Sequence, residues 1–147
     1  MATGFPEAAR RVMDERFGKD SLIALATLSG GRPSVRTVDA LYVDGSFYTI
    51  TWARSNKMRE IAENPVVAVC GEWFTGHGVG ENLGPVGAEA NRALADRLRA
   101  AFAAWYDNGH TNDSDPDTII LRVRLTDGVL MDHGTRYEID FGATAED

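Results

Sequence analysis

The chain has 147 residues, 44% of them hydrophobic and 25% charged, which predicts one globular domain over residues 1–147. A formal net charge of -7 excludes nucleic-acid binding by bulk electrostatics and disfavours an anionic membrane surface as a partner. The sequence has no apolar run of membrane-spanning length, no apolar signal region near its start, and a single cysteine, which cannot form an internal disulfide. These features together predict a cytoplasmic protein.

The first half of the chain predicts three consecutive strands between two helices. An apolar stripe with helical spacing comes first, and a nearly continuous apolar run, typical of a strand buried on both faces, follows it. A Gly-rich turn and an Asp-Gly pair then separate two further strands, as in β-hairpins. The predicted elements are a helix at 6–17, strands at 21–28, 34–43 and 47–52, and a short helix at 55–63.

The second half is dominated by strands, with one long helical pattern. The glycine-rich segment 75–86 is either a loop or a strand opened by bulges. The other predicted elements are a strand at 66–74, a helix at 88–106, a polar loop at 107–117, a strand at 118–126, a turn at Asp127-Gly128 into a strand at 129–131, and a closing strand at 135–141. Hairpin-length connections favour antiparallel pairing, so the fold class is mainly β with flanking helices, arranged as a small barrel.

Residues 51–57 carry the chemistry of an anion site. A strand ends there and a helix begins, and the free amides of a first helical turn attract anions. Thr51, Ser55 and Lys57 add two hydroxyls and an ammonium, the donors that a phosphomonoester needs. The nearest acids, Asp44 and Glu60, are expected to lie outside this cluster. The alternative is that Ser55 only caps the helix and that Lys57 is solvated.

Arg36 stands inside a predicted strand, where a charged side chain needs a partner. With Val35, Leu41 and Val43 assigned to the core, Arg36 points to the opposite face. Its partner is an acid such as Asp39, a subunit interface or a ligand phosphate.

Other candidate sites receive little support from the sequence. The glycines of 76–80 do not meet the spacing of a dinucleotide-binding turn, and three histidines placed on separate loops lack metal-ligand spacing. Cys70, in mid-strand, is expected to be buried and inert. Trp52 and Trp73 are expected to pack in the core, although a flat cofactor could also lie against one of them.

In order and spacing, these segments resemble the FMN-binding split-barrel family, which includes pyridoxamine 5′-phosphate oxidase and bacterial general stress proteins. The resemblance covers about residues 20–75, and weaker likeness continues through GEWFTGHGVGENLG and ILRVRLTDGVL. The segments that carry it are LIALATLSGGRP, VRTV, the Asp44-Gly45 hairpin, FYTIT, SNK at the start of a short helix, and NPVVAV.

The resemblance implies a six-stranded antiparallel split barrel that forms a homodimer, with flavin at the interface and a small-molecule substrate. It assigns the FMN phosphate to Arg36, Ser55 and Lys57. Backbone at Thr37–Val38 and Ile50–Thr51 would contact the ring and ribityl chain. Trp73, or aromatic residues on the predicted long helix, would cover the ring from the other subunit. It names no catalytic side chain, because the flavin itself carries the redox chemistry.

Two alternatives to an FMN-dependent oxidoreductase stay open. One is a deazaflavin-dependent reductase of the same fold, in which Arg32, Arg54 and Arg59 would bind a longer anionic tail. The other is a non-enzymatic flavin or haem binder that acts as a stress-related protein. Oxidation of pyridoxamine phosphate is not expected, because the tail TRYEIDFGATAED lacks the substrate motif of the vitamin B6 oxidases.

Overall fold

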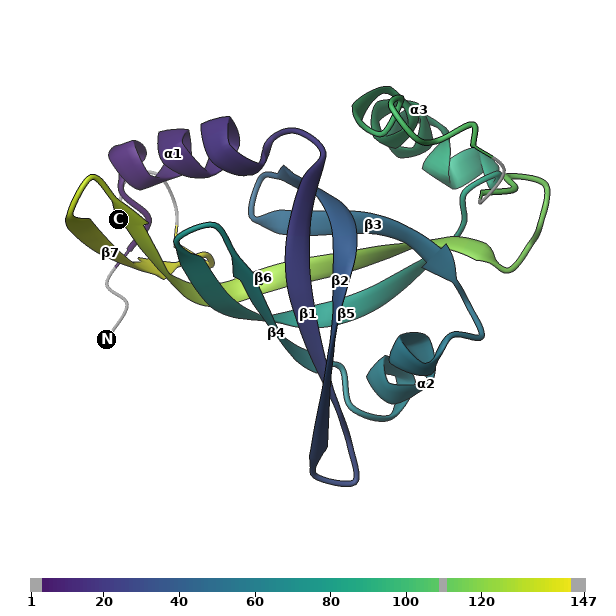
Figure 1. Cartoon of the computed structure of the whole chain (residues 1–147), viewed down its shortest axis with the longest axis horizontal. Helices are drawn as coiled ribbons and strands as arrows, with labels where there is room; N and C mark the ends of the chain where they lie inside the picture. Colours follow the sequence, from purple (N-terminus) through teal and green to yellow (C-terminus); the bar gives the residue numbers. More distant parts are fainter. Residues whose placement is uncertain (1–3, 109–110, 144–147) are drawn as a thin grey trace.

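The computed structural model describes residues 4–108 and 111–143 and shows a β-barrel flanked by helices (Figure 1). The strands are β1 (Ser21–Ser29), β2 (Arg32–Val43), β3 (Ser46–Trp52), β4 (Val66–Gly71), β5 (Phe74–Pro85), β6 (Thr118–Asp132) and β7 (Thr135–Asp140). The helices are α1 (Glu7–Phe17), α2 (Asn56–Glu63), the short 3-10 helix η1 (Glu89–Asn91) and α3 (Arg92–Ala101).

Six strands close into an antiparallel barrel in the order β3-β2-β1-β4-β5-β6, and β3 pairs with β6 to complete the ring. β6 pairs with β5 along one edge and is long enough to pair with two strands along the other. Its first half pairs with β3 from Thr118 to Arg124, and its second half pairs with β7 from Asp127 to Asp132. The predicted fold, a six-stranded antiparallel barrel with flanking helices, is confirmed, and β7 is an addition to it.

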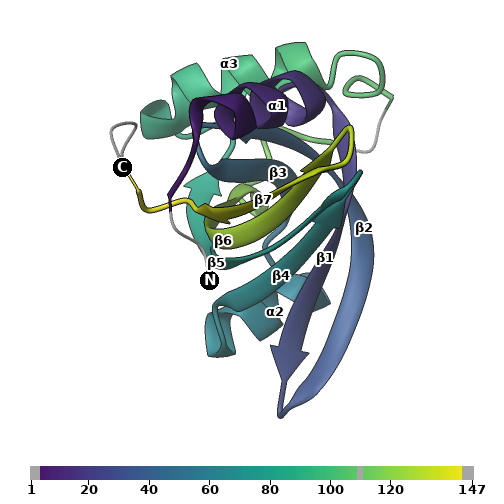
Figure 2. The ribbon, with the colours of Figure 1, turned by 90° about the vertical axis from the view of Figure 1, so that its left-hand side faces the viewer.

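The helices lie at two ends of the barrel. In Figures 1 and 2, α1 and α3 lie along the upper side and α2 lies at the lower end. α1 buries Met13 and Phe17 in the barrel core, where the Phe17 ring packs edge-on against Phe47 and Phe74. α3 covers a separate apolar cluster built from Leu41, Val86, Ala95, Leu98, Phe102, Tyr106 and Ile120. Within the described residues, no helix is long and apolar enough to cross a membrane.

The predicted strand at 66–74 is wrong at its end, because the chain turns back after Gly71. Gly71 pairs with Phe74, so Glu72 and Trp73 form the turn between β4 and β5. Trp73 takes a left-handed backbone conformation with φ of 53° and is 71% exposed. Trp52 is also exposed, so core packing was the wrong expectation for both tryptophans.

The glycine-rich segment is a strand with irregular register, the second of the two predicted alternatives. β5 shifts register against β6 between His77 and Gly78 and again between Asn82 and Pro85. A Cβ on Gly80 would lie 2.9 Å from Cγ2 of Ile61 on α2. The glycine therefore lets α2 pack directly against β5.

A predicted turn, the ends of a predicted helix and the placement of one histidine also differ from the structure. No turn forms at Asp127-Gly128, where β6 continues past a bulge, and the chain reverses at His133-Gly134 instead, with φ of 48° and 84°. The helix predicted over 88–106 is regular only from Arg92 to Ala101. Of the three histidines expected on loops, His77 lies in β5, His133 lies in the turn before β7, and His110 lies outside the described residues.

At the start of β2, the side chains predicted to face the core point outward, and the alternate ones point inward. Val35 is 69% exposed, whereas Val38, Ala40 and Tyr42 pack into the barrel core. Leu41 and Val43 are packed against the α3 cluster on the outer face. Arg36 shares its face with Val38, as predicted, but by strand alternation that face is the interior one.

Candidate cofactor site

The start of α2 presents free donors beside the lower end of the barrel. Ser55 occupies the N-cap position, but its hydroxyl makes no capping hydrogen bond. The Lys57 ammonium lies 3.4 Å from the Ser55 hydroxyl oxygen, and both side chains are half-buried. The cap-only interpretation therefore lacks its hydrogen bond, and the hydroxyl stays available to a ligand.

Arg36 extends from β2 to the same region, and hydrogen bonds to β1 hold its guanidinium in place. Its Nη1 donates to the Thr27 hydroxyl at 2.7 Å and to the Leu25 carbonyl at 3.3 Å, both on β1. Thr27 is only 1% exposed, so the guanidinium has a rigid buried partner on one edge. The side chain as a whole is 25% exposed, which leaves part of its donor set open to solvent.

Glu60 joins this cluster, and the expectation that it lies outside is wrong. Its Oε1 accepts a hydrogen bond from the Thr27 hydroxyl at 2.5 Å and lies 3.4 Å from Nη2 of Arg36. The Thr27 hydrogen bond and the Arg36 guanidinium lower the pKa of the Glu60 carboxyl. Helix α2 begins at Asn56 and brings Glu60, one turn later, to the cluster, which the linear sequence did not reveal.

Asp39 is not the partner of Arg36. It lies beside Asp20, and burial together with the Asp20 carboxyl raises the pKa of Asp39 to about 6. The acid that pairs with Arg36 of β2 is therefore Glu60 on α2.

Lys57 is the least compensated charge of the cluster. Burial, followed by repulsion from Arg36, lowers the pKa of its ammonium. Within residues 4–108 and 111–143, no carboxylate lies within ion-pair distance of Lys57. Two neighbouring cations with one acid, which pairs with Arg36, leave a positive site that a bound anion would stabilise.

The structure separates the other predicted site residues. Thr37 is exposed on the outer face of β2, and Val38 packs into the barrel core. Ile50 packs against the α3 cluster, and Thr51 pairs with Ile119 one residue before β3 ends. Trp73 is not brought to the cluster within one chain, because it follows the end of β4 that is distant from α2 (Figure 1).

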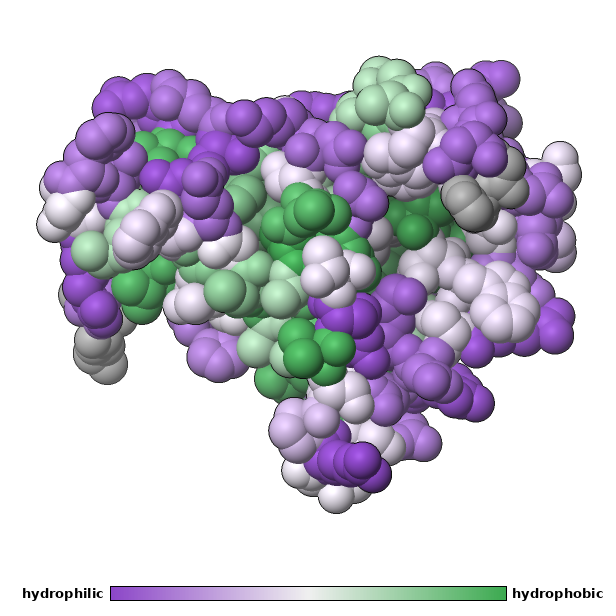
Figure 3. Space-filling model, in the orientation of Figure 1, coloured by the Kyte–Doolittle hydropathy of each residue, from purple (hydrophilic) through white to green (hydrophobic). Residues whose placement is uncertain are grey.

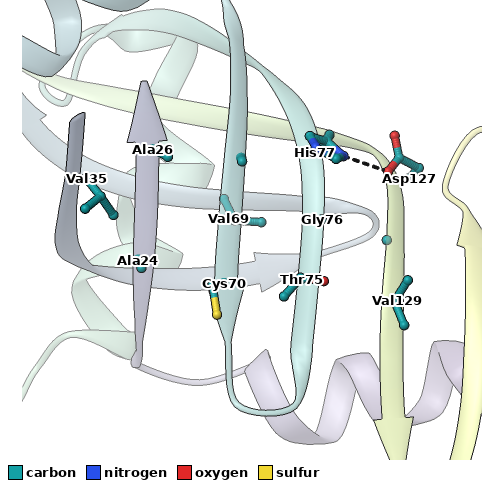
Figure 4. Close-up of a pocket in the computed structure, with 12 residues that line it drawn as sticks. Ala24, Ala26, Val35, Val69, Cys70, Thr75, Gly76, His77, Asp127 and Val129 are labelled. Carbon is teal, nitrogen blue, oxygen red and sulfur yellow. Dashed lines mark hydrogen bonds and ion pairs between the residues drawn. The ribbon is translucent and has the colours of Figure 1, made fainter. Parts of the chain in front are cut away.

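A hollow on the outer face of the barrel is the feature that sequence reasoning missed. It has a volume of about 330 Å³ and an apolar floor, and the His77 ring is 2.9 Å from Asp127 at its edge (Figure 4). Its lining is Ala24, Ala26, Val35, Ala68, Val69, Cys70, Thr75, Gly76, His77, Asp127, Gly128 and Val129. A second hollow shares Ala26, Ala68 and His77 with it and extends to Thr27.

The face that carries these hollows is unusually apolar for an outer surface. Leu22, Val35 and Val66 are exposed there at 66%, 69% and 52%, and Figure 3 shows hydrophobic residues gathered in its middle. Cys70 is exposed on it as well, so the expected buried thiol is wrong. The run at 21–28 was apolar on both faces of a strand, and one of those faces is this open surface.

The arginines considered for a longer anionic tail are largely engaged elsewhere. Arg54 donates to Asp117 at 2.6 and 2.9 Å, and Arg59 donates to the side chain of Asn56. Arg32 is exposed at the start of β2. Across the described residues, no group of three or more His, Cys, Asp or Glu side chains could hold a metal ion.

The sequence model of the pyridoxamine 5′-phosphate oxidase family matches residues 9–131. The chain belongs to this family. The match spans α1 to the end of the barrel, including every residue of the cluster around α2. A search of curated proteins found no match to the chain.

Solved structures with the same fold have low sequence identity to the chain. General stress protein 26 from Bacillus anthracis is 14% identical, with a TM-score of 0.67 over 88% of this chain and 98% of that one. A FAD-binding protein from Mesorhizobium loti is 16% identical, with a TM-score of 0.61 over 78% and 87%. A heme binding protein from Mycobacterium smegmatis is 17% identical, with a TM-score of 0.68 over 92% and 60%. An F420 reductase is 19% identical, with a TM-score of 0.57 over 78% and 94%.

Proposed function

We propose that the protein is an FMN-binding oxidoreductase that acts on a small molecule. In this proposal Arg36, Ser55 and Lys57 hold the phosphate of the cofactor. The observation that carries it is Lys57, a half-buried ammonium without a carboxylate partner among the described residues. It lies beside Arg36 at a helix start where the Ser55 hydroxyl accepts from Lys57 but caps no amide of α2. A phosphate would accept from all three side chains and from free amides of α2.

The apolar hollows support a place for the ring system. They run along the outer face from Val129 past Thr27 to Leu28, while the buried Thr27 hydroxyl contacts Arg36 on the interior face of β1. A planar ring lies well on small side chains such as Ala26 and Ala68, with Thr37 on the neighbouring strand. Backbone at Thr37–Val38 and Ile50–Thr51 remains the proposed contact for the ring and ribityl chain.

A homodimer with flavin at the interface is part of the proposal. The exposed Leu22, Val35 and Val66 lie on the face that carries the hollows, and a second copy of the chain would remove them from water. Trp73, 71% exposed at a hairpin tip, is then available to a cofactor held mainly by the partner. A bound flavin would supply the redox chemistry, while the protein binds and orients it.

The second candidate is a deazaflavin-dependent reductase, and the likeness to an F420 reductase favours it. A third, a non-enzymatic flavin or haem binder, is favoured by the likeness to a general stress protein and to a heme binding protein. All three use the same fold, so the cofactor itself must be identified.

The visible absorbance spectrum of the freshly purified protein, with mass spectrometry of what heat releases, tests the proposal. Oxidised-flavin bands with released FMN support it, and turnover with a nicotinamide donor supports an enzyme over a passive binder. A deazaflavin spectrum or a Soret band would replace FMN by one of the alternatives. A colourless protein that binds none of these cofactors on titration would refute the proposed function.

A further inference from the structure

Glu60 is the acid that pairs with Arg36 in the cation cluster, and two contacts hold its carboxylate in place. The Thr27 hydroxyl accepts from Nη1 of Arg36 at 2.7 Å and donates to Oε1 of Glu60 at 2.5 Å. Glu60 itself is 18% exposed, and the same Oε1 lies 3.4 Å from Nη2 of Arg36. Moving the carboxylate away would leave the buried Thr27 hydroxyl without its acceptor, so the negative charge stays at the site when a ligand arrives.

The fixed carboxylate changes the charge that a phosphate meets. Arg36 and Lys57 carry two positive charges, and Glu60 offsets one of them. A phosphomonoester carries close to two negative charges above its second pKa of about 6, whereas a phosphodiester carries one. A site with two cations and no acid would favour the doubly charged group more strongly than this site does.

We propose that Glu60 is a specificity-determining residue that reduces the preference of the cofactor site for a doubly charged phosphomonoester and so admits a singly charged phosphodiester. This inference rests on the proposed function, because it assumes that the phosphate of a flavin-type cofactor binds beside Arg36 and Lys57. It goes beyond that function by specifying the charge of the phosphate that the site accepts. The fold alone does not determine this charge, because a FAD-binding protein, an F420 reductase and a heme binding protein share it.

The test compares three ligands with one ring system: riboflavin, the methyl ester of FMN, and FMN, which carry zero, one and about two negative charges at pH 7.5. Their dissociation constants are measured by flavin fluorescence for the wild type and for Glu60→Gln. The amide oxygen of Gln can still accept from Thr27, so the variant removes charge with little change in shape. Glu63→Gln is the matched control, because Glu63 ends the same helix and is exposed.

In Glu60→Gln, the ratio of FMN affinity to methyl-ester affinity should rise about 3- to 10-fold over the wild type, with riboflavin affinity unchanged. The Glu63→Gln control should leave the ratio within about 2-fold, as expected for an exposed charge. An unchanged ratio in Glu60→Gln, or equal losses for all three ligands, would overturn the inference and leave Glu60 as a structural anchor of Arg36. A wild type that binds the three flavins equally well would refute the phosphate site, and a wild type that binds none would refute the proposed function.

Discussion

Replacing Lys57 by Met should stabilise the cofactor-free protein and weaken its binding of FMN. The ammonium is half-buried, its pKa is lowered by burial and by Arg36, and among the described residues it faces no carboxylate at ion-pair distance. Its charge therefore destabilises the folded chain, and only a bound anion would offset this effect. Methionine keeps the length of the side chain and removes the charge.

The expected magnitudes follow from these contacts. Loss of charge-assisted hydrogen bonds to a phosphate should cost about 1.5–3 kcal/mol of binding free energy, which weakens FMN roughly 10- to 150-fold. The free energy of unfolding without cofactor should rise by no more than about 1 kcal/mol, because solvent screens a partly exposed ammonium. Riboflavin, which lacks the phosphate, should bind both proteins equally.

Flavin fluorescence titration and urea unfolding measure the two effects. Lys19→Met is the matched control, since Lys19 is the other of the two lysines in the chain and is exposed. The reasoning fails if Lys57→Met and Lys19→Met bind FMN alike, or if the cofactor-free Lys57→Met protein is less stable than the wild type.

Three further predictions concern neighbouring parts of the structure. The raised pKa of Asp39, about 6, means that the folded state keeps its proton longer than the unfolded state, so the free energy of unfolding should fall by about 1 kcal/mol as pH rises from about 4 to 6. Urea titrations over this range should show a smaller fall for Asp39→Asn, and an identical fall would contradict the assignment. Gly80→Ala would place a Cβ 2.9 Å from Ile61 and should lower the free energy of unfolding by about 1–3 kcal/mol in the same assay. An unchanged free energy of unfolding would mean that α2 can shift without cost. Arg54 is 72% exposed and paired with Asp117, so Arg54→Ala should change FMN affinity less than about 2-fold, whereas a large loss of deazaflavin affinity would support the alternative cofactor.

The barrel could be predicted from the sequence because its strands carry local signatures. Hairpin turns such as Asp44-Gly45 set neighbouring strands antiparallel, and Asp44 and Gly45 take left-handed conformations with φ of 46° and 85°. The turn at Glu72-Trp73 was missed because tryptophan rarely takes a left-handed conformation, so nothing in the local sequence marks it. At Asp127-Gly128 the opposite error occurred, since a pair typical of turns lies inside β6, where it pairs with His77 and Gly76 beside a register shift.

From the local pattern alone, the candidate site could be predicted only where its residues follow one another in the sequence, and Arg36 was assigned to it through the family resemblance. Ser55 and Lys57 lie together at the start of α2, as expected. Glu60 and Thr27 could not be assigned to Arg36, because that cluster depends on how α2 packs against β1. The open apolar face was missed for a related reason, since a strand reads as apolar whether its outer face meets a helix, a second chain or solvent.

A crystal structure of the protein with FMN tests the central claim most directly. The phosphate oxygens should lie within about 3.2 Å of donors on Arg36, Ser55 and Lys57, with the ring along the apolar hollows near Ala26 and Ala68. FMN bound with its phosphate elsewhere, and with Lys57 facing solvent, would contradict the assignment of this cluster as the phosphate site.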